Sequence, residues 1–357
     1  MRSKLFLKSS CWIIVLILFS SNLFAQIRGN GNVIQSQRNV SEFSGIVVRS
    51  GIDLSVKQGD KYSLEIEADE NLQQYIISEV KDHVLYVYVE KNRNIWNSKA
   101  MTALVTVKDV NSIKVSGGGD VESEGTIKTD ALKIGISGGG DLEFDLEAEK
   151  ASCSVSGGGD VELKGRIKNF KTEISGGGDL ELRAGVEMLG VSISGGGDAE
   201  ISGGDKVTDA TIKIMGGGDL EMNIACRNLH TEISGGGDAE ILAGEEVIMA
   251  RLTVSGGGEL DLDIVSKELE LSMSGGGDAR LAGAAENLSA KIKSGGDLYA
   301  ADFKVKVAII KLSGGSDAKV LVTEKLTLTA NGGGQIYVSG NPQINASLSG
   351  GSKVHNK

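Results

Sequence analysis

The chain is poor in proline, aromatic residues and cysteine. Its 357 residues include one Pro, two Trp, six Tyr, seven Phe and three Cys. A single proline excludes collagen-like and proline-rich linker sequences, although 51 residues are glycine. Hydrophobic residues make up 40% and charged residues 24%, which is the composition of a folded chain rather than a disordered one.

Positive charge is also scarce. The formal net charge is −11, and because three basic residues (Arg2, Lys4 and Lys8) and no acids lie within residues 1–25, the rest of the chain carries −14. Such a chain repels a phosphate backbone, which argues against a nucleic acid or an anionic membrane surface as a partner.

Residues 1–25 have the features of a secretory signal peptide. The three basic residues precede a short apolar run, residues 12–19, and small and polar residues follow it up to Ala25. The run is about half of the ~20 residues that span a bilayer, so we expect export and cleavage after Ala25. Cys11 precedes the run, where a lipidated cysteine would follow it. No later stretch is apolar enough for a transmembrane span, and the expected location is the cell envelope (outer membrane, cell surface or periplasm) or the medium.

One short motif recurs from residue 116 to the end of the sequence. Its first copy is Ser116-Gly117-Gly118-Gly119-Asp120, and the thirteen copies contain 36 of the 51 glycines. Such regular recurrence indicates a repeat architecture. The fifth-place residues of the later copies follow one another at intervals of 18 to 21 residues: Asp141, Asp160, Asp179, Asp198, Asp219, Asp238, Glu259, Asp278, Asp297, Asp317, Gln335 and Lys353.

Between the motifs, apolar and polar residues alternate, as in Asp160-Val161-Glu162-Leu163-Lys164. Alternation with period two predicts short strands with one buried face. The position five residues before each fifth-place residue is apolar in every copy, from Val115 to Leu348. A column of this kind predicts an all-β fold, a parallel β-helix (β-solenoid), in which each coil covers the previous one.

The glycine motifs are expected at the corners of the coils. An interior glycine costs roughly 0.5–1 kcal/mol relative to alanine, so three in every copy imply a steric demand at the corner. The residue after the motif alternates between alanine and leucine, as in Ala199, Leu220 and Ala239. Either adjacent coils interdigitate large over small residues, or one turn comprises two copies; the sequence leaves both open.

The two cysteines that remain after cleavage are predicted to be free. Cys153 lies seven residues before its Asp and Cys226 seven residues after its own. At ~4.8 Å per coil they would lie several coils apart if each copy is one turn, beyond the ~7 Å between Cα atoms that a disulfide tolerates.

The segment 26–110 lacks the motif and reads as a β-rich cap, continuous with the solenoid array over residues 111–357. Strands are expected around residues 46–48, 52–56, 62–66 and 85–89. A short helix is expected to start near residue 69, with Asp69 as its N-cap. A solenoid needs such a terminal unit to cover its open core and block edge pairing.

The chain after the predicted signal peptide resembles the head GIN domain family of auto-transporter adhesins. The resemblance rests on residues 29–33 and 38–46, on residues 56–60 and 67–72, and on the run from Lys114 through Val121. It implies an exported Gram-negative envelope protein with a right-handed β-helix-like fold. The family supplies no catalytic residues.

The candidate site is a ladder of paired carboxylates. In eight copies the fifth-place acid is followed two residues later by a second acid, and in a strand both point to the same outer face. Stacking would then form two carboxylate columns whose neighbours repel one another. The pairs are Asp120/Glu122, Asp141/Glu143, Asp160/Glu162, Asp179/Glu181, Asp198/Glu200, Asp219/Glu221, Asp238/Glu240 and Glu259/Asp261.

Three interpretations of this ladder stay open. Each Asp accepts hydrogen bonds from its own turn and the second column is hydrated; or the columns bind Ca²⁺ through carboxylate oxygens; or the acidic strip docks a basic partner, an envelope protein or a surface glycan. The strip ends where the second position becomes Arg280, Tyr299 and Lys319. No other cofactor is expected.

The favoured function is non-enzymatic: adhesion or scaffolding through a repetitive acidic face. The alternative is a polysaccharide-processing, pectinase-like β-helix enzyme, since paired carboxylates serve glycosidases. Against it, a catalytic pair should be unique, and residues 111–357 hold only five aromatic side chains for a sugar cleft. His83, His230 and His355 are scattered, and an acid follows nine of the ten glycine triplets, with Gln335 after the tenth, where a phosphate loop has lysine.

Overall fold

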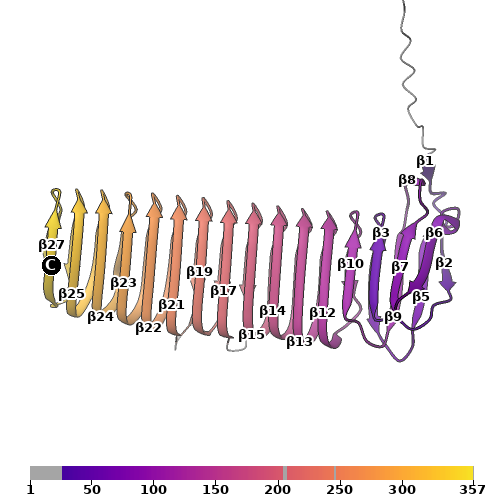
Figure 1. Cartoon of the computed structure of the whole chain (residues 1–357), viewed down its shortest axis with the longest axis horizontal. Helices are drawn as coiled ribbons and strands as arrows, with labels where there is room; N and C mark the ends of the chain where they lie inside the picture. Colours follow the sequence, from indigo (N-terminus) through magenta and orange to yellow (C-terminus); the bar gives the residue numbers. More distant parts are fainter. Residues whose placement is uncertain (1–25, 204–206, 245–246, 357) are drawn as a thin grey trace, which may run out of the picture.

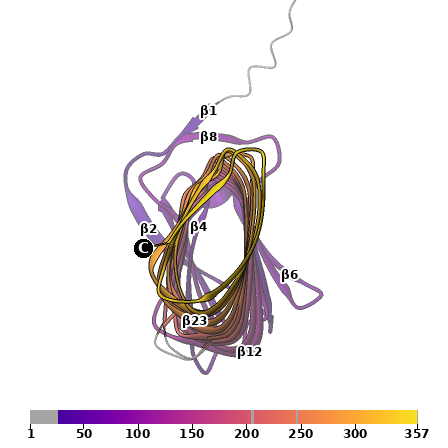
Figure 2. The same cartoon turned by 90° about the vertical axis from the view of Figure 1, so that its left-hand side faces the viewer.

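The protein is a long rod of stacked β-coils with a flattened oval cross-section (Figures 1 and 2). The computed structural model describes residues 26–203, 207–244 and 247–356. The predicted signal peptide, residues 1–25, lies outside these ranges. Within them, no helix is long and apolar enough to cross a membrane.

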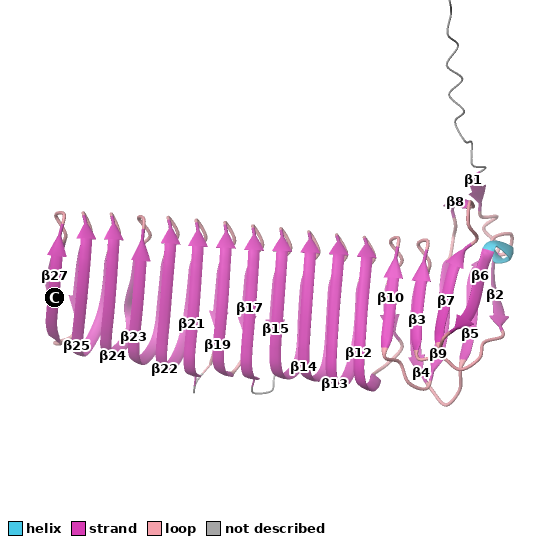
Figure 3. Ribbon diagram, in the orientation of Figure 1, coloured by secondary structure: helices cyan, strands magenta, loops and turns pink. Residues whose placement is uncertain are grey.

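Each coil of the array runs along one long side of the oval, bends, returns along the other side and ends at a glycine corner. In most coils one continuous strand covers both sides, and the arrowheads align along one edge of the rod (Figure 3). The array strands are β10 (Ser112–Ser116), β11 (Val121–Ser123), β12 (Ile127–Gly138), β13 (Leu142–Gly157), β14 (Val161–Gly176), β15 (Leu180–Gly195), β16 (Ala199–Ser202), β17 (Val207–Gly216), β18 (Leu220–Asn223), β19 (Cys226–Gly235), β20 (Ala239–Leu242), β21 (Val247–Gly256), β22 (Leu260–Gly275), β23 (Ala279–Lys293), β24 (Leu298–Gly314), β25 (Ala318–Gly332), β26 (Gln335–Ser339), β27 (Gln343–Ser349) and β28 (Lys353–Asn356).

One repeat forms one turn. All pairings between array strands are parallel, and they place equivalent residues of successive copies side by side, so that Gly157 pairs with Gly176 and Gly176 with Gly195. The predicted β-solenoid is therefore confirmed, and the question of one or two copies per turn is settled in favour of one. The alternating alanines and leucines after the motif are direct neighbours across coils, as in Ala199, Leu220 and Ala239. Large residues thus lie over small ones.

The core is a set of aliphatic columns along the rod. The predicted column five residues before the fifth-place residue is buried from Val115 to Ala330. Its last member, Leu348, is 40% exposed because no further described coil covers it. Both free cysteines are buried in the core, which confirms that they form no disulfide.

The N-terminal segment contributes two coils of its own. It contains β1 (Gln26–Arg28), β2 (Val33–Arg38), β3 (Gly45–Arg49), β4 (Asp53–Gln58), β5 (Ser63–Asp69), the 3₁₀ helix η1 (Gln73–Tyr75), β6 (Ile76–Lys81), β7 (Val84–Val89), β8 (Asn94–Asn97) and β9 (Met101–Val107). The coil of β3 and β4 lies between that of β7 and β9 and that of β10 and β11. The stacking order of the coils therefore differs from their order in the chain. The division between cap and array at residue 110 stays a prediction.

Antiparallel strands end the parallel stack. On one side β5 pairs with β9 and β2 with β5, and on the other side β6 pairs with β7. These strands occupy the edges that would otherwise be free to pair with another chain.

The helix prediction near residue 69 was wrong in its cap. Only the three residues of η1 are helical, after Leu72 and without a side-chain cap. Asp69 is buried at the end of β5, where its carboxylate accepts hydrogen bonds from the backbone N–H groups of Gly31 and, at 2.6 Å, of Lys99. Asp69 thus ties the first residues of the described chain and the loop after β8 to the cap.

Only two glycines of each triplet meet the predicted steric demand. At the corner that follows β14, a Cβ on Gly176 would lie 1.9 Å from the carbonyl oxygen of Gly157, and a Cβ on Gly178 would lie 2.1 Å from the carbonyl oxygen of Gly159. Gly176 also has a φ of +129°. A Cβ on the middle residue, Gly177, would meet nothing within 4 Å. The first and third glycines let the corners stack, whereas the middle one meets no such clash and has a positive φ only in the first copy, at Gly118 (+109°).

Candidate functional site

The fifth-place aspartates form a hydrogen-bonded ladder between coils. Oδ1 of Asp160 accepts from the backbone N–H of Asp179 at 2.9 Å, and Oδ1 of Asp179 accepts from that of Asp198 at 2.8 Å. The same bond joins each neighbouring pair from Asp53 to Glu259, and again from Asp278 to Gln335. The expectation that each Asp serves its own turn was wrong, because the donor belongs to the next coil.

This ladder explains how a column of like charges is tolerated. Each carboxylate accepts a hydrogen bond from a backbone N–H group, which favours its charged form and offsets part of the repulsion. Burial raises the pKa of Asp53, the first member; the bond from Asp120 lowers it, and the charges of Asp120 and Glu122 raise it.

Asp53 was missed in the sequence analysis. It lies on β4, outside the repeats, but occupies the aspartate position of its coil. The degenerate motif Ser50-Gly51-Ile52-Asp53 could have revealed it.

The ladder has one interruption, at Glu259. No bond joins the backbone N–H of Asp278 to this side chain, although both residues are described. The longer side chain of Glu259 instead contacts Arg280, with Nη1 and Oε2 2.6 Å apart. Glu259 therefore does not make the hydrogen bond to the next coil that an aspartate makes at the equivalent position.

The second carboxylates form the predicted parallel column. Strand register places Glu122, Glu143, Glu162, Glu181, Glu200, Glu221, Glu240 and Asp261 side by side on successive coils. Unlike the aspartates, these side chains have no common backbone donor.

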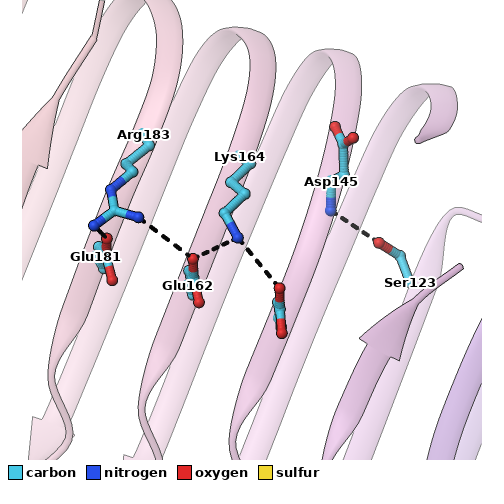
Figure 4. A network of polar contacts seen from close by, with 7 residues as sticks. Ser123, Asp145, Glu162, Lys164, Glu181 and Arg183 are labelled. Atoms are coloured by element: carbon cyan, nitrogen blue, oxygen red, sulfur yellow. Dashed lines mark hydrogen bonds and ion pairs between the residues drawn. The ribbon is translucent and has the colours of Figure 1, made fainter. Parts of the chain in front are cut away.

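Basic residues neutralise the second column at some coils only. Lys164 lies between Glu143 and Glu162, with Nζ–Oε1 distances of 3.2 and 2.6 Å, and Arg183 contacts Glu162 and Glu181 (Figure 4). The Lys164 ammonium has a raised pKa because of these two glutamates, Glu162 first. Further along, Glu200, Glu221 and Glu240 have no ion-pair partner among the described residues and are exposed.

The two columns line a long surface groove. Its first part has a volume of about 770 Å³ and extends from Asp53 to Glu200; its second part, about 370 Å³, continues from Asp198 to Glu240. The structure thus brings together fourteen of the sixteen predicted ladder residues along one groove, and only Glu259 and Asp261 lie beyond it.

Toward the C-terminus, basic and aromatic side chains replace the carboxylates of the second column. In the second column Arg280 lies over the ring of Tyr299, 5.8 Å from its centroid, and Lys319 lies 5.2 Å from the same centroid. Tyr337 and His355 continue the column as a stacked pair. The change of residue type therefore replaces carboxylate repulsion with cation–π and aromatic contacts between coils.

The structure provides no preformed metal cluster in the ranges it describes. Within them, no group of three or more His, Cys, Asp or Glu side chains is arranged to hold an ion. The calcium interpretation stays a prediction. The histidines are far apart in the sequence, and His355 contacts Gln335 at 2.8 Å through Nε2.

The architecture defines a class of protein, the parallel β-solenoids with an antiparallel cap. The chain belongs to the family described as "Putative auto-transporter adhesin, head GIN domain", whose model matches residues 42–208, 174–249 and 249–342. The resemblance inferred from the sequence is thereby confirmed. No curated protein matches the chain.

Several solved structures are similar over most of the chain. A protein of Parabacteroides distasonis described as a putative lipid binding protein is 16% identical, with a TM-score of 0.37; the match covers 93% of this chain and 99% of that one. A putative adhesin of Parabacteroides merdae is 19% identical, with a TM-score of 0.31 and the same coverage. A putative adhesin of Bacteroides fragilis is 18% identical, with a TM-score of 0.29, and covers 93% and 100%.

Proposed function

We propose that this chain is an exported, non-enzymatic protein of the cell envelope or surface, which acts as an adhesin or scaffold by docking a basic partner along its acidic groove. Membership of an adhesin family supports an exported or surface role. The partner is an envelope protein or a surface glycan that carries positive charge.

The observation that carries this proposal is the difference between the two carboxylate columns. The aspartates are engaged by backbone donors of the next coil, so their role is structural. Glu200, Glu221 and Glu240 make no such bond and line the second part of the groove. Their charge, repeated at each coil, attracts and orients a cationic ligand.

The mature chain, immobilised, should capture basic envelope proteins or cationic glycans in a salt-dependent manner. Triple replacement of Glu200, Glu221 and Glu240 by Gln should abolish capture at physiological salt. The matched control replaces Glu232, Glu268 and Glu270, which lie on the other long side of coils in the same region. Equal capture by both triple variants, or release of reducing sugar from a polysaccharide panel, would overturn the proposal.

A calcium-stabilised form of the same function is tested separately. If the columns bind Ca²⁺, the melting temperature should rise with Ca²⁺ and fall with EDTA. Unchanged melting in both conditions removes calcium from the proposal but leaves the basic partner.

A further inference from the structure

The other long side of the rod carries a groove of opposite character. It has a volume of about 660 Å³ and is lined by residues of β12, β13, β14, β15 and β17. This volume lies within the range of small-molecule sites, about 300–1,000 Å³. The groove shares no residue with the acidic groove.

Two outward columns form most of its surface, and Glu173, Ser192 and Lys213 of a third column complete it. The first contains Ala131, Lys150, Asn169, Met188 and Asp209, and the second contains Lys133, Ser152, Lys171, Gly190 and Thr211. Small residues in the second column alternate with lysines and leave space between them. Gly190 lies beside Lys171, whose Cγ would be 3.1 Å from an added Cβ.

The floor of this groove is apolar. Met188 is 52% exposed, the most exposed large hydrophobic side chain on the described coils of the array. Ala131 is exposed in the same column, three coils from Met188, and the methylene stems of the lysines add further apolar surface. A thioether at the centre of a solvated sheet face adapts readily to an apolar ligand.

The rim is basic, although the protein as a whole is acidic. Four lysines and two acids line the groove. Lys133, Lys150 and Lys171 are exposed and form no ion pair with any described residue, whereas Lys213 pairs with Glu232 at 3.0 Å. The two acids are Glu173 and Asp209, and the hydrogen bond that Asp209 accepts from the neutral amide of Asn228 does not compensate its charge. The three unpaired lysines therefore exceed the two acids by one, which gives the groove a small positive excess, in contrast to the net charge of −11 of the whole chain.

We propose that this groove binds a single-chain anionic amphiphile, with its hydrocarbon chain over Met188 and Gly190 and its carboxylate head between the lysines. Charge complementarity selects the acidic head, and the apolar floor selects the chain. A nucleic acid or an anionic vesicle carries many charges and would be repelled by the net negative charge of the whole protein. A single amphiphile molecule carries one charge, which interacts mainly with the nearby lysines. This proposal is independent of the acidic groove.

Calorimetric titration of the mature chain with laurate, below its critical micelle concentration and at low ionic strength, tests it. We expect saturable binding that weakens with salt and is absent for dodecyl maltoside. Gly190→Leu should fill the groove and weaken binding at least tenfold. Gly190 has no positive φ and sits on a strand, so this variant should fold, which circular dichroism can verify.

Two further variants keep the test decisive. Gly135→Leu is the matched control, because Gly135 is a strand glycine on the same side, outside the groove, whose added Cβ would lie 3.8 Å from Cγ of Lys114. It should bind laurate as the wild type does. Lys171→Gln should weaken binding several-fold and reduce its salt dependence. Absence of saturation by laurate, equal binding of dodecyl maltoside, equal loss in Gly135→Leu, or binding only to anionic vesicles would each overturn the proposal.

Discussion

Neighbouring glycines of one corner should respond to alanine with opposite sign. In Gly178→Ala the new Cβ would lie 2.1 Å from the carbonyl oxygen of Gly159, so the two coils must move apart by about 0.9 Å to reach the 3.0 Å below which real Cβ contacts essentially never occur. In Gly177→Ala the Cβ meets nothing within 4 Å, and no positive φ is imposed.

The loss of stability in Gly178→Ala can be estimated from the contacts that this movement of the coils disturbs. The corner is held by the bond from the N–H of Gly177 to the carbonyl of Gly157, 3.1 Å, and by the aspartate bond from Asp179 to Asp160, 2.9 Å. Overpacking costs about 1–3 kcal/mol and a weakened hydrogen bond about 1 kcal/mol, so Gly178→Ala should destabilise by about 2–4 kcal/mol. Gly177→Ala should stabilise by about 0.4–1 kcal/mol, because alanine restricts the unfolded chain.

Guanidinium unfolding of both variants and the wild type measures these differences. Since stacked repeats unfold in parts, hydrogen exchange of the amides in β14 and β15 should accompany the global curve. Faster exchange at this corner is expected in Gly178→Ala alone. Equal destabilisation by both substitutions, or none by Gly178→Ala, would refute the stacking argument.

Four other outcomes are expected. Asp179→Ala should cost about 0.5–1.5 kcal/mol in denaturant unfolding, whereas Asp179→Asn, which keeps an acceptor and removes a like charge, should be neutral or stabilising; a neutral alanine variant would contradict the ladder. Glu259→Asp should restore the missing rung and slow exchange of the amide at position 278, and unchanged exchange would show that side-chain length is irrelevant. Burial raises the pKa of Cys153 to about 12 and that of Cys226 to about 11, so both thiols should resist a thiol reagent at pH 8 until the protein is unfolded. For Asp69, burial raises the pKa, but the hydrogen bonds from backbone N–H groups outweigh burial and lower the pKa. The stability that Asp69 contributes is therefore present above the unfolded pKa of about 3.9 and is lost as pH falls through the folded pKa, so the tryptophan fluorescence of β8 should report opening of the cap below about pH 4 in the wild type. The same titration in Asp69→Asn would show that another group is responsible.

Some features depend on local pattern, and these could be predicted from the sequence. Alternation with period two decides which side chains face inward, and a motif repeated at nearly constant spacing decides that the coils stack in register. The column from Val115, the free cysteines and the carboxylate columns follow from these two regularities, whereas the family was indicated by a resemblance carried mostly by residues that precede the repeats. Both regularities act within one repeat or between adjacent repeats, so the sequence alone is enough to recognise them.

Other features depend on contacts between residues far apart in the sequence, and only the tertiary structure decided them. The partner of each aspartate lies on the next coil, the coil of β3 and β4 sits between two later ones, and Asp69 caps strands rather than a helix. The groove on the other long side arises because Lys133, Lys150 and Lys171, which are 17 and 21 residues apart, come to lie on one side when the coils stack. The regular spacing of the acids revealed their columns, but the irregular spacing of these lysines did not, so their proximity was decided only by the packing of the coils.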